Sequence, residues 1–239
     1  MAFIIGGNVL NASMSDTQDY LNVIQSGLKM HLDASTLQSY PGSGTDWYDI
    51  SGNNNNGILI NGPTFSTNAI RLDGVNDYIF LPNLGFAPPA FTSELWIKRH
   101  ANNGYFFVIH NSDNPELRMQ FINGNVVSYF FDDGGYGAII TSIASITLDV
   151  WYHVVMTGQS NDFRLYINGT LDTADTLGTY TGGINGNAGE HTLGTYNRPG
   201  TGYGGYANVS YGAYRFYNRV LSANEILHNF NVQKGRFGL

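Results

Sequence analysis

The chain has 239 residues, of which 42% are apolar, 12% are charged and none is cysteine. The apolar share predicts a folded domain, and the absence of thiols excludes thiol catalysis, thiolate zinc sites and disulfides. Eleven Lys and Arg against 18 Asp and Glu give a formal net charge of −7. Because affinity for nucleic acid is carried by clustered cations, this balance argues against a DNA or RNA partner.

The N-terminal segment, residues 1–26, differs from the rest of the chain because it lacks hairpin turns. It has no basic stretch followed by a long apolar run, so we expect no signal peptide. We also expect no membrane insertion, since nowhere do 18 apolar residues run together. A capping pattern, with Ser15 followed by Gln18, predicts a short helix. An apolar stretch near its start contains Phe3, Ile4, Ile5, Val9 and Leu10.

These apolar residues lead us to interpret residues 1–26 as an attachment arm. A sandwich domain built from residues 27–239 does not need them for its core. An isolated apolar segment tends to aggregate in water, so a partner surface or an added-strand contact is the expected destination. The alternatives are that the arm folds back over its own sheet edge or is disordered.

Residues 27–217 consist of short alternating or aromatic runs separated by turns. Phe163, Leu165 and Ile167 share one face of such a run, and Arg164 and Tyr166 share the other, which is the period of a half-buried strand. Asn-Gly pairs, which favour two-residue hairpin turns, begin at Asn56, Asn61, Asn103, Asn123, Asn168 and Asn185. The predicted strands are residues 28–32, 69–72, 78–81, 93–98, 105–110, 117–122, 126–131, 151–157, 163–167 and 211–217. This pattern predicts an all-β fold of two packed antiparallel sheets.

One short helix is predicted near the C-terminus. Ser222 and Glu225 match a capping box. In this motif the Ser hydroxyl accepts a hydrogen bond from the Glu amide, and the Glu carboxylate accepts one from the Ser amide. Ile226, Leu227 and Phe230 then recur at helical spacing. We expect this amphipathic helix to dock on the sandwich.

The acidic residues and histidines do not form the patterns that catalysis requires. Hydrolysis of a glycosidic bond needs two carboxylates, one to protonate the leaving oxygen and one to attack, and a Glu-x-Asp-x-x-Glu pattern does not occur here. Asp132 and Asp133 are followed by two glycines, which favours a solvated hairpin turn. His153 lies in an aromatic run and is interpreted as a packed histidine. The chain's glutamates are Glu94, Glu116, Glu190 and Glu225. We expect no enzymatic activity.

Several oxygen-bearing side chains lie in turns where they could converge on calcium. These residues are Asp33, Asp49, Asn53, Asn55, Asp73 and Asp77. The alternative is a purely local role, in which Asp and Asn side chains accept hydrogen bonds from their own turns. No calcium ligand is assigned at this stage.

A glycine-rich stretch at residues 195–206 carries a candidate contact surface. Its tyrosines offer faces for stacking on sugar rings, and its amide and guanidinium groups could fix hydroxyls. Two alternatives stay open, a plain surface loop and a contact for another protein, because Tyr and Arg are enriched at interfaces. The candidate residues are Tyr196, Asn197, Arg198, Tyr203 and Tyr206.

Short blocks in a fixed order carry a resemblance to a known family. They are GLKMHLD at 27–33, WYDISGN at 47–53, LDGVNDY at 72–78, WYHVV at 151–155, LYING at 165–169 and YNRVLS at 217–222. Together they resemble the laminin-G-like members of the concanavalin A-like lectin/glucanase superfamily. The resemblance implies a jelly-roll sandwich and, in many such domains, a calcium ion at the rim. Residues 40–45 and 229–238 are similar to domains of tailed bacteriophages, especially those of cyanobacteria.

The leading hypothesis is a non-enzymatic virion structural protein, displayed on the surface of a phage capsid or tail and bound there to other virion proteins. The alternative is a carbohydrate-binding lectin or adhesion module that contacts host-surface glycans. The fold alone does not decide between them, because it hosts lectins, adhesion modules, hydrolases and virion proteins.

Overall fold

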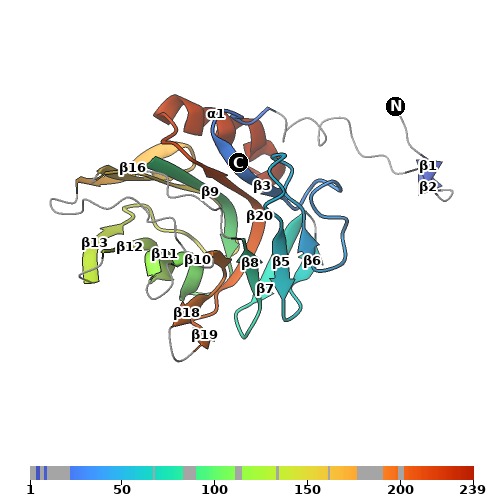
Figure 1. Cartoon of the computed structure of the whole chain (residues 1–239), viewed down its shortest axis with the longest axis horizontal. Coiled ribbons are helices and arrows are strands. Elements are labelled where there is room, and N and C mark those ends of the chain that lie inside the picture. The colour runs from blue at the N-terminus through green and yellow to red at the C-terminus, as the bar shows by residue number, and fades with distance from the viewer. Residues whose placement is uncertain are drawn as a thin grey trace.

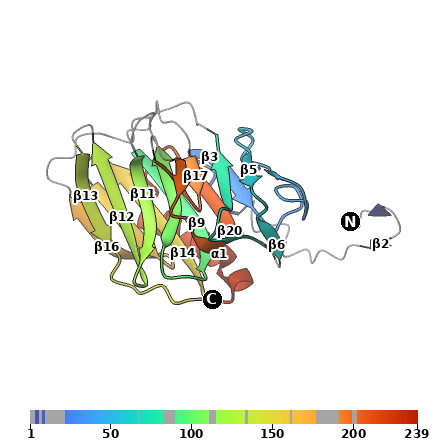
Figure 2. The same ribbon diagram turned by 90° about the horizontal axis from the view of Figure 1, so that it is seen from below.

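The computed structural model describes residues 4–5, 8–9, 22–66, 68–82, 90–110, 115–132, 135–160, 162–176, 191–198 and 202–239. The regular structure of these residues is almost all β-strand, with one α-helix near the C-terminus. Two eight-stranded antiparallel sheets form two layers (Figures 1 and 2). This arrangement confirms the predicted jelly-roll sandwich.

The first sheet has β20 and β9 at its centre, and β3 pairs with the far end of β20. We call it the helix sheet, because the C-terminal helix lies against its outer face (Figure 1). Its strands are β16 (Thr170–Thr176), β15 (Asp162–Ile167), β14 (Trp151–Gln159), β9 (Ala90–Arg99), β20 (Asn208–Tyr217), β7 (Ala69–Asp73), β6 (Thr64–Ser66) and β3 (Leu28–Asp33).

The second sheet carries Tyr78, Tyr105 and Tyr129, and we call it the tyrosine sheet. Its strands are β13 (Gly135–Thr141), β12 (Asn125–Asp132), β11 (Pro115–Ile122), β10 (Gly104–His110), β17 (His191–Leu193), β8 (Tyr78–Leu81), β5 (Gly57–Ile60) and β4 (Asp46–Trp47). A two-stranded hairpin of β18 (Tyr196–Arg198) and β19 (Gly202–Gly204) follows β17.

The main core lies between the sheets. Phe163, Leu165 and Ile167 of β15 are buried in it, while Arg164 points the other way and is exposed. Tyr166 also faces away from the main core and is buried in a smaller cluster beneath the C-terminal helix. Burying each large apolar side chain stabilises the fold by about 1.5–3 kcal/mol, so the alternating pattern fixes which face turns inward.

All ten predicted strands are present, several of them longer than predicted. The strands that the pattern does not predict are short, or they lack alternating apolar residues. The edge strand β16, for example, has the sequence TLDTADT, whose one leucine is exposed. Pairing with a neighbour therefore forms these strands without a strong local signal.

Two of the predicted Asn-Gly pairs make two-residue hairpins in the left-handed region. Asn123 and its following glycine have φ of 49° and 92° and join β11 to β12. Asn168 and its glycine have φ of 51° and 77° and join β15 to β16. Asn56 is different, because the glycine after it begins β5 instead of a turn. Asn185 lies outside the described residues.

The C-terminal helix α1 (Ala223–Gln233) begins at the predicted capping box. Ser222 accepts from the Glu225 amide, and the Glu225 side chain accepts from the Ser222 amide at 2.8 Å. Ile226 is fully buried against the helix sheet and Phe230 is half-buried, as the spacing predicts. Leu227 is a correction, since it is 41% exposed on the solvent side of the helix. A 3₁₀ turn, η1 (Lys234–Phe237), follows.

The first strands, β1 (Ile4–Ile5) and β2 (Asn8–Val9), pair with each other and with no other described strand. Phe3, Leu10 and the helix expected at residues 15–18 lie outside the described residues. The attachment arm therefore stays a prediction. Within the part of the chain that the structure describes, no helix is long and apolar enough to span a bilayer.

Residues just before the predicted boundary at residue 26 contact the domain. Val23 is buried, and the Ile24 amide donates to Asn229 Oδ1 at 2.9 Å. The Asn22 carbonyl lies 2.7 Å from His228 Nε2 on α1. These contacts tie residues 22–24 to the C-terminal helix.

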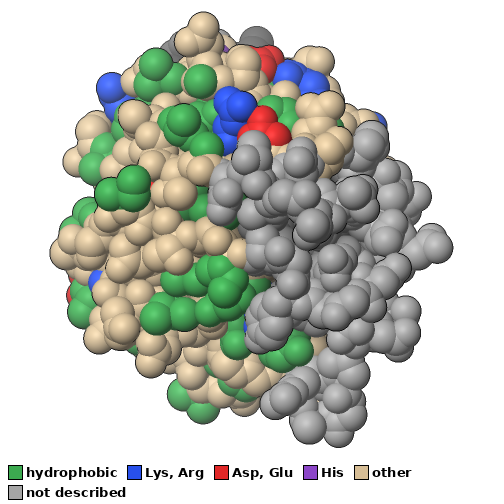
Figure 3. Space-filling model, turned by 90° about the vertical axis from the view of Figure 1, so that its left-hand side faces the viewer, with side chains coloured by type: hydrophobic (Ala, Val, Ile, Leu, Met, Phe, Trp, Pro, Cys, Tyr) green, Lys and Arg blue, Asp and Glu red, His purple; other side chains and the backbone are tan. Residues whose placement is uncertain are grey.

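One end of the sandwich, at the edge strands β13 and β16, has an apolar surface. Figure 3 views this end and shows hydrophobic side chains gathered there with few charged ones. Ile139 is 51% exposed, Ile143 is 80% exposed and Leu171 is 46% exposed. Exposed apolar surface of this kind often marks contacts with other proteins.

Candidate functional site

The hairpin β18–β19 lies beside the tyrosine sheet, next to β10 and β8 (Figure 1). Hydrogen bonds fix its base. Thr192 Oγ1 donates to the Thr195 carbonyl at 2.8 Å, and Thr195 Oγ1 donates to the Gly204 carbonyl at 3.0 Å. The Tyr105 amide of β10 donates to the Gly205 carbonyl at 2.9 Å. The glycine-rich stretch is therefore an anchored element of the sheet.

Tyrosines from the hairpin pack on tyrosines from the sheet. The Tyr203 ring stacks on Tyr78 with centroids 4.6 Å apart, and the Tyr196 ring tilts against Tyr105 at 5.3 Å. Gly205 has a φ of 62°, and a Cβ there would overlap the Tyr105 ring. A glycine is thus required for the hairpin to approach β10.

A single arginine joins three of the rings. The Arg118 guanidinium carbon lies 4.8 Å from the Tyr129 centroid, 5.5 Å from Tyr196 and 5.6 Å from Tyr105. Arg118 and Tyr129 are directly paired across β11 and β12. All four side chains are half-buried, so the cluster is fixed by packing yet remains accessible. We call Tyr78, Tyr105, Arg118, Tyr129, Tyr196 and Tyr203 the tyrosine cluster.

The structure brings some of the predicted contact residues into this cluster. Tyr196 and Tyr203 belong to it, and Asn197 is the register partner of Tyr203 in the hairpin. Tyr206 is half-buried just after the hairpin, and the Arg198 side chain lies outside the description. The cluster members on β8, β10, β11 and β12 are not among the residues predicted from the sequence.

A signal for two of the missed residues exists in the alternation of their strands. Leu117 and Met119 are core residues, which leaves Arg118 on the outer face of β11. Val126 is likewise in the core, so Tyr129 three positions on has the opposite orientation. That these two residues lie in one cluster with Tyr196 depends on the order of the strands in the sheet, which no local sequence pattern predicts.

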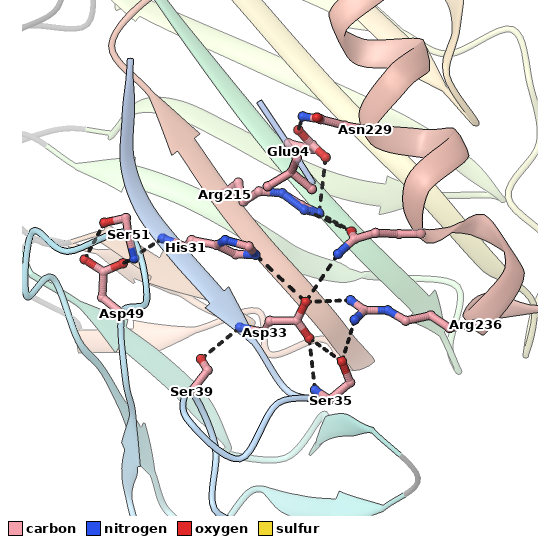
Figure 4. A network of polar contacts seen from close by, with 12 residues as sticks. His31, Asp33, Ser35, Ser39, Asp49, Ser51, Glu94, Arg215, Asn229 and Arg236 are labelled. Carbon is pink, nitrogen blue, oxygen red and sulfur yellow. Dashed lines mark hydrogen bonds and ion pairs between the residues drawn. The ribbon is translucent and has the colours of Figure 1, made fainter. Parts of the chain in front are cut away.

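A second polar cluster lies under α1, on the outer face of the helix sheet (Figure 4). Glu94 is buried, with Arg215 Nη2 at 3.4 Å, His153 Nε2 at 2.9 Å and Asn229 Nδ2 at 2.8 Å. Burial alone would raise the pKa of Glu94, but Arg215 and the His153 hydrogen bond outweigh it and lower the pKa to about 2.

The same cluster continues at Asp33. Its carboxylate accepts from Arg236 Nη2 at 2.8 Å, from Gln233 Nε2 at 3.3 Å and from the Ser35 hydroxyl at 2.7 Å. Burial would raise the pKa of Asp33, yet Arg236 and His31 hold it well below the usual range. The two carboxylates thus bind the C-terminal segment to the sheet.

The structure shows where several of the residues considered for catalysis lie. Glu94 and His153 are fully buried beneath α1, where they contact each other. The packing predicted for His153 is thereby confirmed. Glu225 is committed to the helix cap and to Arg219 at 2.6 Å. Glu190 lies outside the described residues, and the Glu116 side chain is not described.

The residues considered for calcium make local hydrogen bonds. Asp49 accepts from the amides of His31, Ser51 and Asn55 at 2.8–2.9 Å, and so organises the Asn-rich loop. Asp73 accepts from the Val75 amide at 2.7 Å. The Asp77 carboxylate accepts from the Asp73 amide, and Asn53 and Asn55 donate to backbone carbonyls of β3. Across the described residues, no group of three or more His, Asp or Glu side chains is placed to hold a metal.

A small pocket of about 190 Å³ lies between β15 and the start of α1. Its lining includes Thr157, Tyr166 and Ser222. Arg164, at its edge, is paired with Asp162 at 2.7 Å. The charge of Arg164 at this pocket is therefore already balanced by a neighbouring carboxylate.

Solved structures with the same fold include parts of larger proteins. A Trypanosoma rangeli sialidase mutant displaying trans-sialidase activity has a TM-score of 0.68 and 18% identity, over 91% of this chain and 34% of its own. The botulinum neurotoxin serotype D ligand-binding domain, in complex with N-acetylneuraminic acid, has a TM-score of 0.67 and 15% identity, over 92% and 53%. The binding domain of Paraclostridial Mosquitocidal Protein 1 has a TM-score of 0.64 and 21% identity, over 87% and 52%.

The chain thus spans about a third to a half of the length of these proteins, and at such identities the likeness shows the fold alone. None of the curated proteins matches it. A sequence profile described as the concanavalin A-like lectin/glucanases superfamily matches residues 73–227. That range is more than half of the chain and includes the whole tyrosine cluster. The chain therefore belongs to the concanavalin A-like lectin/glucanases superfamily.

Proposed function

We propose that this chain is a non-enzymatic carbohydrate-binding module whose ligand surface is the tyrosine cluster. The observation that carries the proposal is the anchored hairpin, which places Tyr196 and Tyr203 against tyrosines of the sheet. Half-buried rings held by packing offer apolar faces to a sugar ring at little cost in side-chain entropy. Asn197 and Arg118 are the polar side chains that lie next to these rings.

The comparisons support saccharides as a ligand class. The neurotoxin domain was determined with N-acetylneuraminic acid, and the Trypanosoma rangeli protein is a sialidase. Each is much longer than this chain, so its ligand is a property of the larger protein.

The burial of Glu94 supports the non-enzymatic part of the proposal. A glycoside hydrolase needs two carboxylates that reach the scissile bond. Glu94 and Asp33 are instead enclosed by α1 and η1, where each neutralises an arginine. We expect no hydrolysis of β-glucans or other polysaccharides by the full chain.

The test is a glycan array followed by calorimetric titration of the ligands that it identifies. Tyr196→Ala and Tyr203→Ala should each weaken binding about tenfold, since stacked aromatic groups each contribute about 1–2 kcal/mol. Tyr48→Ala is the matched control, because this tyrosine is 43% exposed outside the cluster. Unchanged binding by both cluster variants, or no glycan bound by the wild-type chain, would contradict the proposal.

A second candidate function is display on a virion, with the N-terminal arm as the attachment. The observations that favour it are the separate pairing of β1 with β2 and the apolar end of the sandwich. The two functions are compatible, since a displayed protein can also bind host glycans.

Deleting residues 1–14 tests this second function. The melting temperature should be nearly unchanged, because β1 and β2 pair with each other and with no described strand of the two large sheets. Incorporation into purified phage particles, measured by mass spectrometry, should fall sharply. Normal incorporation of the truncated chain would overturn the arm hypothesis, and a large fall in melting temperature would assign the segment to the fold.

A further inference from the structure

One buried arginine has no carboxylate partner among the described residues. Arg99, the last residue of β9, is 5% exposed and lies on the same side of its strand as the core residue Ile97. Arg215, which is also buried, is paired with Glu94, whereas no described carboxylate forms an ion pair with Arg99. A guanidinium stays charged in proteins, and a buried charge without a counter-charge is costly. The described residues therefore leave the charge of Arg99 unbalanced.

Neutral groups occupy only part of the Arg99 guanidinium. Its Nε donates to the Ile146 carbonyl, and its Nη1 donates to the Ala101 carbonyl at 3.2 Å and to Asn102 Oδ1 at 2.9 Å. Its Nη2 donates to none of the described residues. This nitrogen is not fully enclosed, in contrast to the unpaired Nε of Arg215. Nη2 therefore keeps free N–H groups and some access to solvent.

A second free donor faces the same point. Gly124, in the hairpin between β11 and β12, has a φ of 92°, and a Cβ there would lie 2.9 Å from Ser145 Oγ and 3.4 Å from Arg99 Nη2. Ser145 is exposed, and its hydroxyl donates to none of the described residues. The Ile146 amide donates to the Gly124 carbonyl at 2.6 Å, which fixes this loop beside the hairpin. Two donors from different segments thus converge where a glycine leaves room.

The free groups favour a compact anion. A carboxylate binds arginine best through two parallel hydrogen bonds, but the N–H groups of Nε and Nη1 are already used. Nη2 and one hydroxyl suit a single acceptor atom with a full negative charge, as in a halide ion. The Phe121 ring centroid lies 6.0 Å from the Arg99 guanidinium carbon, and Ile146 is fully buried. In such apolar surroundings a charge-assisted hydrogen bond is stronger than in water.

We propose that Arg99 and Ser145 bind a chloride ion beside Gly124. The ion balances the buried guanidinium and links three segments at one end of the sandwich, namely the end of β9, the β11–β12 hairpin and the loop that contains Ser145. The site is separate from the tyrosine cluster, so it does not depend on the proposed carbohydrate-binding function. Because the ion binds the folded chain, chloride should raise the melting temperature.

The experiment compares melting curves of the full chain in sodium chloride and in sodium gluconate at equal ionic strength. Gluconate is a bulky anion and serves as the reference. Chloride should raise the melting temperature of the wild type by about 2–4 °C over gluconate, and the rise should saturate as chloride increases. Sodium acetate should give a smaller rise, because only Nη2 of the guanidinium is free to donate. A larger rise in acetate than in chloride would overturn the assignment to a halide.

Matched glycine variants identify the site. Gly124→Ala fills the space beside the two donors and should remove the rise that chloride causes. Gly62→Ala is the control, because Gly62 also follows an asparagine and has a φ of 102°, but no atom lies within 4 Å of the added Cβ. This control should keep the full rise. Ser145→Ala removes one donor from an exposed residue and should at least halve the rise.

Each comparison is made between two salts on the same variant, so a variant of lower stability is still informative. Chloride NMR line widths give a second readout, since exchange with a protein site broadens the line, and the wild type should broaden it severalfold more than Gly124→Ala. Equal melting temperatures of the wild type in chloride and gluconate, or an undiminished rise in Gly124→Ala, would overturn the inference. An equal rise in the wild type and in Ser145→Ala would indicate a general salt effect and would also overturn it.

Discussion

The outer faces of the two sheets use charge in opposite ways. On the helix sheet, Glu94 and Asp33 are buried beneath α1 and paired with Arg215 and Arg236. On the tyrosine sheet, Arg118 is half-buried among rings, and no helix covers it among the described residues. Under the proposed function, one face of the sandwich serves stability and the other serves recognition.

The difference follows from solvent access. A buried charge is costly to leave unpaired, so each carboxylate under α1 is held by an arginine and by amide donors. A half-buried cation next to aromatic rings loses only part of its hydration, so it does not require a buried counter-charge. Variants on the first face should therefore change stability, whereas variants on the second should change binding.

The largest expected effect is the loss of a buried partner. Arg215→Met would leave Glu94 without its arginine, and the free energy of unfolding should fall by about 3–5 kcal/mol. Arg71→Met, on an exposed arginine of the neighbouring strand β7, should change it by no more than about 0.5 kcal/mol. Denaturant titration measures both. Equal small effects of the two substitutions would mean that the buried pair does not hold α1.

Acid should weaken the same face. The pKa of Glu94 is lowered to about 2, so its stabilising contribution is present above its unfolded pKa, about 4.3, and is lost as pH falls toward 2. Asp33, whose pKa is also lowered, acts in the same direction.

The free energy of unfolding should therefore fall between about pH 5 and pH 2, by on the order of 3 kcal/mol from Glu94 alone. Denaturant titrations across this range measure the change. The Arg215→Met variant is the control, because without the arginine the dependence on pH should be weaker. A stability that stays constant or rises on acidification would contradict the account.

A smaller effect is expected where the hairpin meets the tyrosine sheet. Gly205→Ala would place a Cβ in the Tyr105 ring at a φ of 62°, which costs about 1–3 kcal/mol and displaces the hairpin. Gly202→Ala is the matched control for backbone strain. Gly202 also has a positive φ, of 82°, but no atom lies within 4 Å of the added Cβ. Saccharide affinity should fall severalfold more in the first variant than in the second. The same loss in both would mean that backbone strain, and not the contact with Tyr105, controls binding.

Local patterns in the sequence predict much of the fold. The alternation of β15 and the capping box at Ser222 each depend on neighbouring residues, and both are confirmed. Leu227 shows the limit of such patterns, because its spacing matches the buried face while the helix orientation leaves it exposed.

The candidate site could be predicted only in part, because strand order and register do not appear in the local sequence. Tyr196 and Tyr203 lie in one glycine-rich stretch, so composition alone indicates them. Arg118 reaches Tyr196 only because β17 inserts between β10 and β8, and β18 follows β17. Likewise, Glu94 and Arg215 meet through the register of β9 with β20. Pairings between distant strands have no local signature.

The most direct test of the difference between the faces is hydrogen–deuterium exchange of the full chain with and without a saturating concentration of a saccharide that the glycan array identifies. The account predicts added protection in peptides from β10, β11, β12 and the hairpin β18–β19, with α1 and β15 unchanged. Protection confined to α1 and β15, around the pocket near Arg164, would contradict it.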